Sequence, residues 1–213
     1  EDAMGSFKES KCVNSGNPLR QEFRETKPVP INPEKLSLLV LGGSQGARAI
    51  NYSMVMLLEE LLETFPTLFI RHQTGASDFG GVLQHYQQFD SNRYDVQPFL
   101  DEMPKMYAEA SLVICRAGAL TVSELIYMQR PAIFIPYPRS GQNDQTANAY
   151  MVKAAGAGLV VEQGKGFEDR LKAELFQSLK PATLLAMSLG YSKLRSPNAL
   201  VTIGDRIDSD LHS

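Results

Sequence analysis

Two stretches of the chain combine a buried strand, a turn of small residues and the start of a helix. They are "LLVLGGSQGARAIN" (residues 38–51) and "LVICRAGALTVSELI" (residues 112–126). Such a turn brings backbone N–H groups close to a ligand, and the positive end of the helix dipole favours an anion there. On the first stretch alone, a tight turn that holds nothing fits equally well. The second stretch, of the same design, favours a phosphate site.

Neither stretch matches a standard nucleotide motif. The first has no Gly-Lys-Ser/Thr ending, so it is not a P-loop, and Ser44 stands where G-x-G-x-x-G needs its second glycine. This spacing weighs against an NAD-type dehydrogenase domain. The next predicted strand also ends in Arg71 and His72, where such a domain has an acidic residue. The residues favour a nucleotide or sugar-phosphate ligand without giving the reaction.

Glu124 has two interpretations. Thr121-x-x-Glu124 has capping-box spacing, in which the glutamate reaches back to the backbone at the helix start. A carboxylate at this place in a nucleotide-binding sheet can instead accept hydrogen bonds from a ribose diol. The local pattern alone favours the cap.

Two polar segments follow other predicted strands at the same expected edge. "RHQTG" (71–75) contains His72, which could act as a base, although a lone histidine at a strand end is more often structural. "PYPRSGQNDQTANA" (136–149) contains side chains that suit either sugar hydroxyls or a helix cap: Asn143, Asp144, Gln145 and Asn148. The histidines and cysteines show no metal-ligand spacing.

The elements that position these residues follow from the hydrophobic pattern. Short apolar runs alternate with amphipathic segments, which predicts an α/β fold with a Rossmann-like, doubly wound parallel sheet. Several runs are continuously apolar, as expected for strands covered on both faces. The predicted strands are 36–41, 67–72, 94–99, 111–115, 131–136 and 157–162. The predicted helices between them are 48–63, 78–89, 101–109, 121–129 and 144–154.

The two ends of the chain have a different character. Residues 24–35 contain three prolines and few apolar residues, which predicts a linker before the first sheet strand. After residue 163 the pattern predicts three helices, of which the last two start at Pro181 and Pro197.

Composition argues against several classes of protein. The net charge is −3, with 21 basic residues interspersed among 24 acidic ones, which argues against nucleic-acid binding. No apolar run approaches the ~20 residues of a membrane-spanning helix. Cys12 and Cys115 make no disulfide scaffold, so a reducing, cytosolic setting is favoured and Cys115 is expected to be a buried thiol.

Taken together, "GGSQGARAIN", "RAGALTVSE" and "DQTANA" resemble the MurG family of bacterial peptidoglycan glycosyltransferases. "SGNPLR" (15–20), "HQTG" and "FLDEM" (99–103) also fit in order, so the resemblance runs from about residue 11 to 180. It implies inverting transfer of N-acetylglucosamine (GlcNAc) from UDP-GlcNAc to lipid I, giving lipid II. It also implies a GT-B fold, with two Rossmann-like domains, of which this chain is the C-terminal, donor-binding half.

This resemblance divides the chain into four parts. Residues 1–23 would be the tail of a missing N-terminal domain, 24–35 a linker, 36–180 the UDP-GlcNAc-binding domain and 181–213 C-terminal helices. The missing domain would supply the catalytic base and the contacts with lipid I and the membrane. The full-length enzyme would then be cytoplasmic and peripheral to the inner face of the membrane. This chain alone is expected to bind UDP-GlcNAc weakly and to be inactive.

The family pattern implies that the donor site consists of Arg20, Ser44, Leu100, Ala119, Leu120, Thr121, Val122, Ser123, Glu124 and Gln145. Ser44 and the backbone of residues 119–121 would face the diphosphate, with Arg20 adding positive charge. No catalytic residue, metal ligand or cofactor is implied in this chain.

The remaining implied contacts are with the nucleoside and the sugar. Glu124 would bind the ribose hydroxyls, the backbone of Leu100 would meet the uracil edge, and Gln145 would bind the GlcNAc hydroxyls. Asp144 departs from the histidine or glutamine expected at that position, so no role is carried over to it. The alternative function is a non-catalytic, nucleotide-sugar-binding subunit of a split GT-B transferase.

Overall fold

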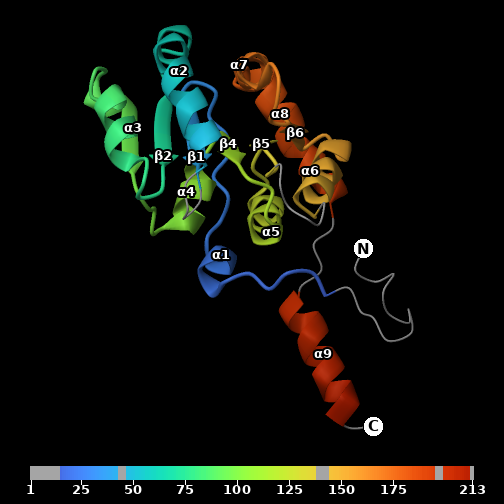
Figure 1. Cartoon of the computed structure of the whole chain (residues 1–213). Helices are drawn as coiled ribbons and strands as arrows, with labels where there is room; N and C mark the ends of the chain where they lie inside the picture. Colours follow the sequence, from blue (N-terminus) through green and yellow to red (C-terminus); the bar gives the residue numbers. More distant parts are fainter. Residues whose placement is uncertain (1–14, 43–46, 138–143, 195–198, 212–213) are drawn as a thin grey trace.

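The computed structural model describes residues 15–42, 47–137, 144–194 and 199–211. Its centre is a six-stranded sheet with the order β3-β2-β1-β4-β5-β6 and parallel pairing throughout (Figure 1). The strands are β1 (Ser37–Leu41), β2 (Phe69–Gln73), β3 (Tyr94–Gln97), β4 (Leu112–Cys115), β5 (Ala132–Phe134) and β6 (Gly158–Val160). The predicted doubly wound parallel sheet is therefore confirmed.

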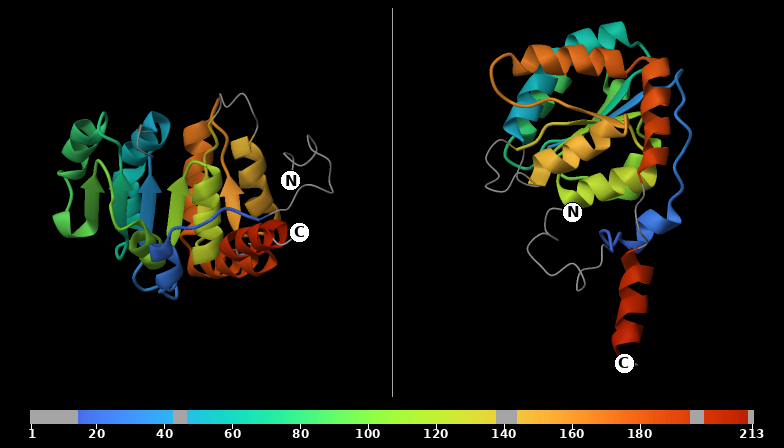
Figure 2. Two further views of the ribbon diagram at one scale, coloured as in Figure 1. Left: turned by 90° about the horizontal axis from the view of Figure 1, so that it is seen from below. Right: turned by 90° about the vertical axis from the view of Figure 1, so that its right-hand side faces the viewer.

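Helices cover both faces of this sheet (Figures 1 and 2). The α-helices are α1 (Gln21–Glu25), α2 (Arg48–Thr64), α3 (Phe79–Tyr86), α4 (Met103–Glu109), α5 (Ala119–Met128), α6 (Asp144–Ala154), α7 (Phe167–Ser178), α8 (Pro181–Gly190) and α9 (Ala199–Leu211). Short 3₁₀ turns occupy η3 (Ser91–Arg93) and η4 (Tyr191–Lys193). Among the described residues, no helix is long and apolar enough to cross a membrane.

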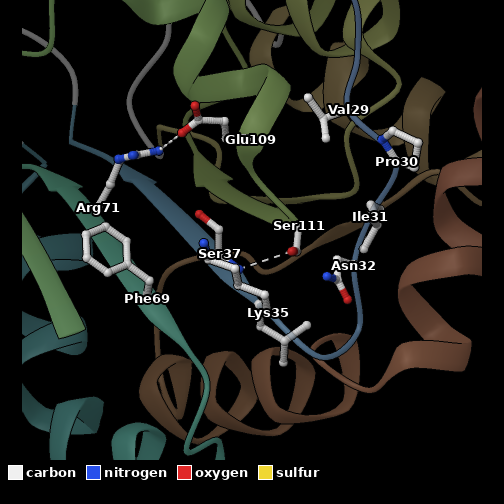
Figure 3. Close-up of a pocket in the computed structure, with 11 residues that line it drawn as sticks. Val29, Pro30, Ile31, Asn32, Lys35, Ser37, Phe69, Arg71, Glu109 and Ser111 are labelled. Carbon is white, nitrogen blue, oxygen red and sulfur yellow. Dashed lines mark hydrogen bonds and ion pairs between the residues drawn. The ribbon is translucent and has the colours of Figure 1, made fainter. Parts of the chain in front are cut away.

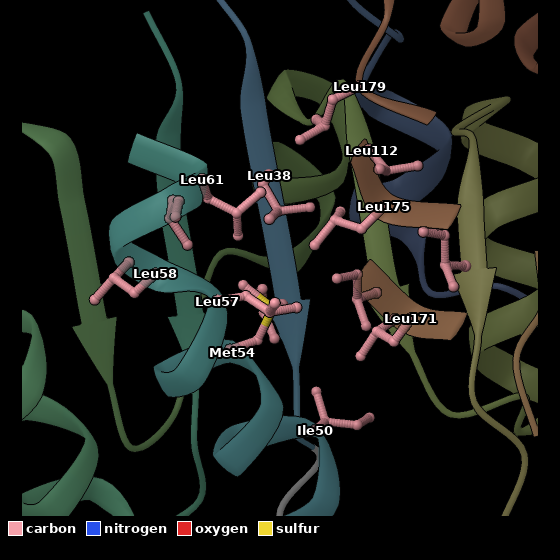
Figure 4. Packing of buried hydrophobic residues seen from close by; sticks show 14 of the residues in the cluster. Leu38, Ile50, Met54, Leu57, Leu58, Leu61, Leu112, Leu171, Leu175 and Leu179 are labelled. Atoms are coloured by element: carbon pink, nitrogen blue, oxygen red, sulfur yellow. The ribbon is translucent and has the colours of Figure 1, made fainter. Parts of the chain in front are cut away.

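Alternate residues of the central strands belong to two separate hydrophobic cores. Leu38 and Val40 of β1 face one core, which is closed by the apolar sides of α2 and α7 (Figure 4). Leu39 and Leu41 face the other core, which includes residues of α4, α5 and α6. Because side chains alternate across a strand, a strand covered on both faces must be apolar throughout. This explains the continuous run that predicted β1.

The segment before β1 is fixed to the sheet domain at two places. Phe23 of α1, a short helix that the sequence did not predict, is fully buried in the core with Leu39. Farther along, the N–H of Val29 donates to the carbonyl of Ala108 at 3.3 Å, and the guanidinium of Arg130 donates to the carbonyl of Val29. The proline-rich stretch is therefore extended but held against α4.

The C-terminal helices differ in how they pack. α8 begins at Pro181, as predicted, and contributes Leu184 and Met187 to the core of α2 and α7. By contrast, α9 extends away from the sheet (Figures 1 and 2). Its exposed apolar side chains are Leu200, Val201, Ile203 and Ile207. The predicted helix start at Pro197 lies outside the described residues.

Candidate functional site

A cavity of about 200 Å³ lies at the carboxyl edge of the sheet. Leu41, Gln73 and Cys115, the last residues of β1, β2 and β4, form its floor, and α4 and α5 contribute other lining residues. The strand order changes direction between β1 and β4, and α/β sheets bind ligands at this kind of switch point. The volume is below the ~300 Å³ of the smallest whole-ligand pockets, so it suits one part of a larger ligand.

The second predicted turn ends at the start of α5, beside this cavity. Gly118 is the N-cap residue, so Ala119, Leu120 and Thr121 form the first helical turn. Their N–H groups have no acceptor within the helix and carry the positive end of its dipole. The capping-box interpretation of Thr121-x-x-Glu124 is therefore wrong, because Thr121 is already inside the helix. The local pattern misplaced the cap because glycine can serve as an N-cap without a side-chain signal.

Glu124 projects from α5 into the cavity. Its side chain is 17% exposed, and Oε1 lies 3.9 Å from Nη2 of Arg20. Burial is the largest influence on this carboxyl and raises its pKa, whereas a hydrogen bond from Tyr107 and the charge of Arg20 lower it. The net effect is a raised pKa. The carboxylate is thus available to a ligand on one side and held by the protein on the other.

The segment that carries Arg20 is attached to the start of α5. Nδ2 of Asn17 donates to Oγ of Ser123 at 2.9 Å and to the carbonyl of Ala119 at 3.4 Å. The hydroxyl of Ser123 also donates to that carbonyl, at 2.9 Å. The two bonds from Asn17 join residues more than 100 positions apart in sequence, and they hold the segment that carries Arg20 against the helix that carries Glu124.

Arg116, directly after β4, is a site residue that the sequence analysis missed. Its Nη1 donates to the carbonyls of Ile135 and Pro136, at 2.9 and 3.2 Å, and to Oε1 of Gln163 at 2.7 Å. Burial lowers its pKa. Arg116 lines the cavity and ties together the ends of β4, β5 and β6. A charged residue immediately after a buried strand was the signal that could have identified it.

Two other predicted donor residues make hydrogen bonds within the protein. The N–H of Leu100 donates to Oε1 of Gln73 at 3.1 Å, and Gln73, but not Leu100, lines the cavity. Oε1 of Gln145, in α6, accepts from the N–H of Tyr137 at 3.0 Å. Gln145 does not line the cavity and stands farther along the sheet edge, after β5.

Only part of the first predicted turn is described, because residues 43–46, which include Ser44, lie outside the described residues. Asn143, in the polar segment 136–149, also lies outside them. A side chain at Gly42 would place its Cβ 2.9 Å from the carbonyl oxygen of Gln73 and 3.0 Å from Oδ1 of Asn51. Only glycine fits this approach. Asp144 is the first residue of α6.

His72 is fully buried and forms part of a polar network on the α2–α3 face. Its Nδ1 lies 3.1 Å from the hydroxyl of Tyr86, and its Nε2 lies 3.0 Å from Oδ1 of Asn51. Burial lowers its pKa to about 3. The histidine is therefore structural and has no access to the cavity. Cys115 is a buried free thiol, as expected.

A second cavity, of about 430 Å³, lies at the opposite edge, where the strands begin (Figure 3). Ser37 and Phe69 start β1 and β2 there, and Arg71 is paired with Glu109 at 2.6 Å. The helices that directly follow strands begin at the carboxyl edge, so their N-termini, which favour phosphate, lie away from this second cavity. Within the described ranges, no group of three or more His, Cys, Asp or Glu could hold a metal ion.

The strand order, with α5 beginning at the switch point, defines a Rossmann-like α/β domain. The chain belongs to the glycosyltransferase family 28 C-terminal domain family, whose model matches residues 37–200. This match confirms the prediction of the C-terminal half of a GT-B glycosyltransferase.

Named relatives agree with this assignment. The chain is 38% identical over 186 residues to the UDP-N-acetylglucosamine–N-acetylmuramyl-(pentapeptide) pyrophosphoryl-undecaprenol N-acetylglucosamine transferase of Syntrophotalea carbinolica, covering 87% of this chain and 48% of the relative. It is 35% identical over 206 residues to the protein of that name from Anaeromyxobacter sp., covering 96% and 54%. The crystal structure of Acinetobacter baumannii MurG superposes with a TM-score of 0.69 at 31% identity, covering 89% and 53%. The chain thus spans about half the length of these relatives.

Proposed function

We propose that this chain is the donor-binding half of a transferase that moves GlcNAc from UDP-GlcNAc to lipid I in peptidoglycan synthesis. The observation that carries the proposal is the open start of α5 with Glu124 and Arg20 beside it, at the switch point of the sheet. The names of the relatives support this reaction, and they do not favour a non-catalytic subunit.

The diphosphate would lie at the start of α5. The N–H groups of residues 119–121 supply donors there, Val122 and Ser123 continue the turn, and Arg20 contributes a positive charge. Ser44, in the first turn, would face the same phosphates. A helix N-terminus and an arginine provide positive potential for an anion without a bound cation or a cofactor.

The nucleoside would extend from the diphosphate into the cavity. Glu124 would accept hydrogen bonds from the ribose hydroxyls, and the backbone of Leu100 would meet the uracil edge. Leu100 N–H would then have to exchange its present acceptor, Oε1 of Gln73, for the base. Gln145 would bind the GlcNAc hydroxyls beyond β5.

In the proposed reaction the acceptor hydroxyl attacks the anomeric carbon from the face opposite UDP, and the configuration inverts. Negative charge develops on the leaving diphosphate, where the start of α5 and Arg20 stabilise it. A base must take the proton from the acceptor hydroxyl. We assign the base, and the contacts with lipid I and the cytoplasmic membrane surface, to the part of the relatives that this chain does not span. Alone, the chain is expected to form no lipid II.

Calorimetric titration with UDP tests this site through Glu124→Ala. Loss of a carboxylate that binds ribose should weaken UDP binding by roughly 1–3 kcal/mol. Glu109→Ala is the matched control, since Glu109 is an ion-paired glutamate at the opposite edge of the sheet. Equal UDP affinity in the two variants would refute the assignment of Glu124, and an absence of UDP or UDP-GlcNAc binding by the folded wild-type chain would refute the proposed function.

A further inference from the structure

Tyr107 lies behind Glu124 and has no part in the donor site described so far. It belongs to α4, it is only 1% exposed, and it lines the same cavity as Glu124. Its hydroxyl is close enough to the carboxylate of Glu124 to lower the pKa of Glu124 as a hydrogen-bond donor. A tyrosine in a core usually needs a partner for its hydroxyl, and here the partner is Glu124, the residue that we propose binds the ribose.

The ring of Tyr107 reaches the other charged residue of the site through Phe23. The two ring centroids are 5.8 Å apart, with an interplanar angle of 44°. Cζ of Arg20 lies 5.4 Å from the centroid of Phe23, and its Nη2 lies 3.9 Å from Glu124. These side chains therefore form one connected group, which we call the Tyr107 cluster and which consists of Tyr107, Phe23, Arg20 and Glu124.

We propose that Tyr107 is a positioning residue that orients the carboxylate of Glu124 toward the ribose diol and, through Phe23, steadies Arg20. The inference rests on the proposed function, because it assumes that Glu124 binds ribose. A carboxylate has about four acceptor sites, so it can accept from Tyr107 and from two ribose hydroxyls together. Fixing its rotamer before binding removes part of the entropic cost of ordering the side chain.

The charged and titratable groups around Glu124 come from several elements. Arg20 precedes α1, Tyr107 is on α4, Cys115 ends β4, and Arg116 follows it. Burial raises the pKa values of Tyr107 and Cys115, so both remain protonated near neutral pH and Tyr107 remains a donor. Removing its hydroxyl should raise the pKa of Glu124 further, because the hydrogen bond favours the carboxylate.

Tyr107→Phe tests the proposal, because phenylalanine keeps the ring against Phe23 and removes only the hydroxyl. The affinity of the 213-residue chain for UDP and for 2′-deoxy-UDP is measured by calorimetry. We expect UDP affinity to fall about threefold to tenfold, and the preference for UDP over 2′-deoxy-UDP to fall by a similar factor. The acid midpoint of UDP binding should also move to higher pH.

Tyr191→Phe is the matched control, since Tyr191 is another buried tyrosine of the same core and donates to the carbonyl of Arg130. It should leave UDP affinity and the ribose preference within about twofold, because its hydroxyl touches no part of the cavity. The acid midpoint of UDP binding should stay unchanged. If Tyr107→Phe gives the same unchanged values as this control, Tyr107 is only a core residue and the proposal is overturned.

A double-mutant cycle with Glu124→Gln separates the inference from the function on which it rests. If Tyr107 acts through Glu124, Tyr107→Phe should have little further effect in the Glu124→Gln chain, whereas additive losses would overturn the positioning role. If Glu124→Gln alone leaves the ribose preference intact, the proposed ribose site itself is wrong. Should Tyr107→Phe not melt cooperatively, Glu124→Asp replaces it. Aspartate is too short to reach both Tyr107 and ribose, so an unchanged ribose preference would again overturn the proposal.

Discussion

Two polar clusters stand at the same edge of the sheet, on opposite faces, and their differences separate structure from function. The His72 cluster consists of His72, Asn51, Tyr86 and Asp78, between α2 and α3. In this cluster both ring nitrogens of His72 have partners, and Nδ2 of Asn51 donates to the carbonyl of Thr74 at 2.9 Å and to Oδ2 of Asp78 at 2.8 Å. Both ring nitrogens of His72 and both amide hydrogens of Asn51 are therefore engaged within the protein.

The Tyr107 cluster is built differently. Glu124 has protein partners on one side only, Tyr107 and Arg20, and its other side faces a cavity. A buried polar group with all its partners supplied by the protein stabilises the fold, whereas one that opens onto a cavity retains capacity for a ligand. Changes to the His72 cluster should therefore alter stability, and changes to the Tyr107 cluster should alter nucleotide binding.

The largest expected effect is on stability, from Asn51→Leu. The change leaves Nε2 of His72, the carbonyl of Thr74 and Asp78 without their buried partner. We expect the free energy of unfolding in urea to fall by about 3 kcal/mol, while UDP affinity of the folded protein stays within about twofold. Asn17→Ala, which removes an amide near Glu124, should cost less than about 1 kcal/mol of stability. Equal losses from the two changes would contradict the comparison.

The next effect is a pH dependence of stability that comes from His72. Its pKa is about 3 in the folded chain against 6.5 unfolded, so the unfolded state binds more protons between these values. The stabilisation is fully present above pH 6.5 and decreases as the pH falls toward 3, and the share lost by pH 5 is about 2 kcal/mol. Denaturation curves in the pH range from 7 to 5 measure it. His85→Ala should keep this slope, and a flat profile in the wild-type chain would mean that His72 is accessible to protons.

The smallest expected effect comes from Arg20→Ala. This side chain is 61% exposed and lies 3.9 Å from Glu124, so solvent screens its charge. UDP binding should weaken by about 0.5–1 kcal/mol, and the difference should shrink as salt is added. Lys27→Ala, a change of an exposed cation farther along the same segment, is the control. A loss that does not depend on salt would indicate that Arg20 acts through packing on Phe23 instead.

Sequence patterns predicted the helices and strands better than they predicted the side-chain contacts between them. Short apolar runs identified the six strands, and the signal is continuous in β1, β4 and β5 because these strands are buried on both faces. The start of α5 was misplaced, because its cap is a glycine and the Thr121-Glu124 spacing imitated a capping box. The short α1 was not predicted, because it is held by the burial of one residue, Phe23.

The candidate site shows the same division. Its place at the strand ends follows from the two strand-turn-helix stretches, and the family resemblance adds Glu124 and Arg20 as charged donor residues. Tyr107 and Arg116 were not predicted, because their importance depends on partners that only the folded chain brings close. The contact between Tyr107 and Phe23, for example, joins α4 to α1. Such pairing leaves no trace in a local pattern.

The most direct test of the central claim is a crystal structure of the chain soaked with UDP. The account predicts electron density for the nucleotide at the carboxyl edge, with the ribose hydroxyls on Glu124 and the diphosphate at the N–H groups of residues 119–121. It also predicts an empty cavity at the opposite edge, between Arg71 and Ser111. Nucleotide density in that opposite cavity, or a ribose at the carboxyl edge that makes no contact with Glu124, would contradict the account.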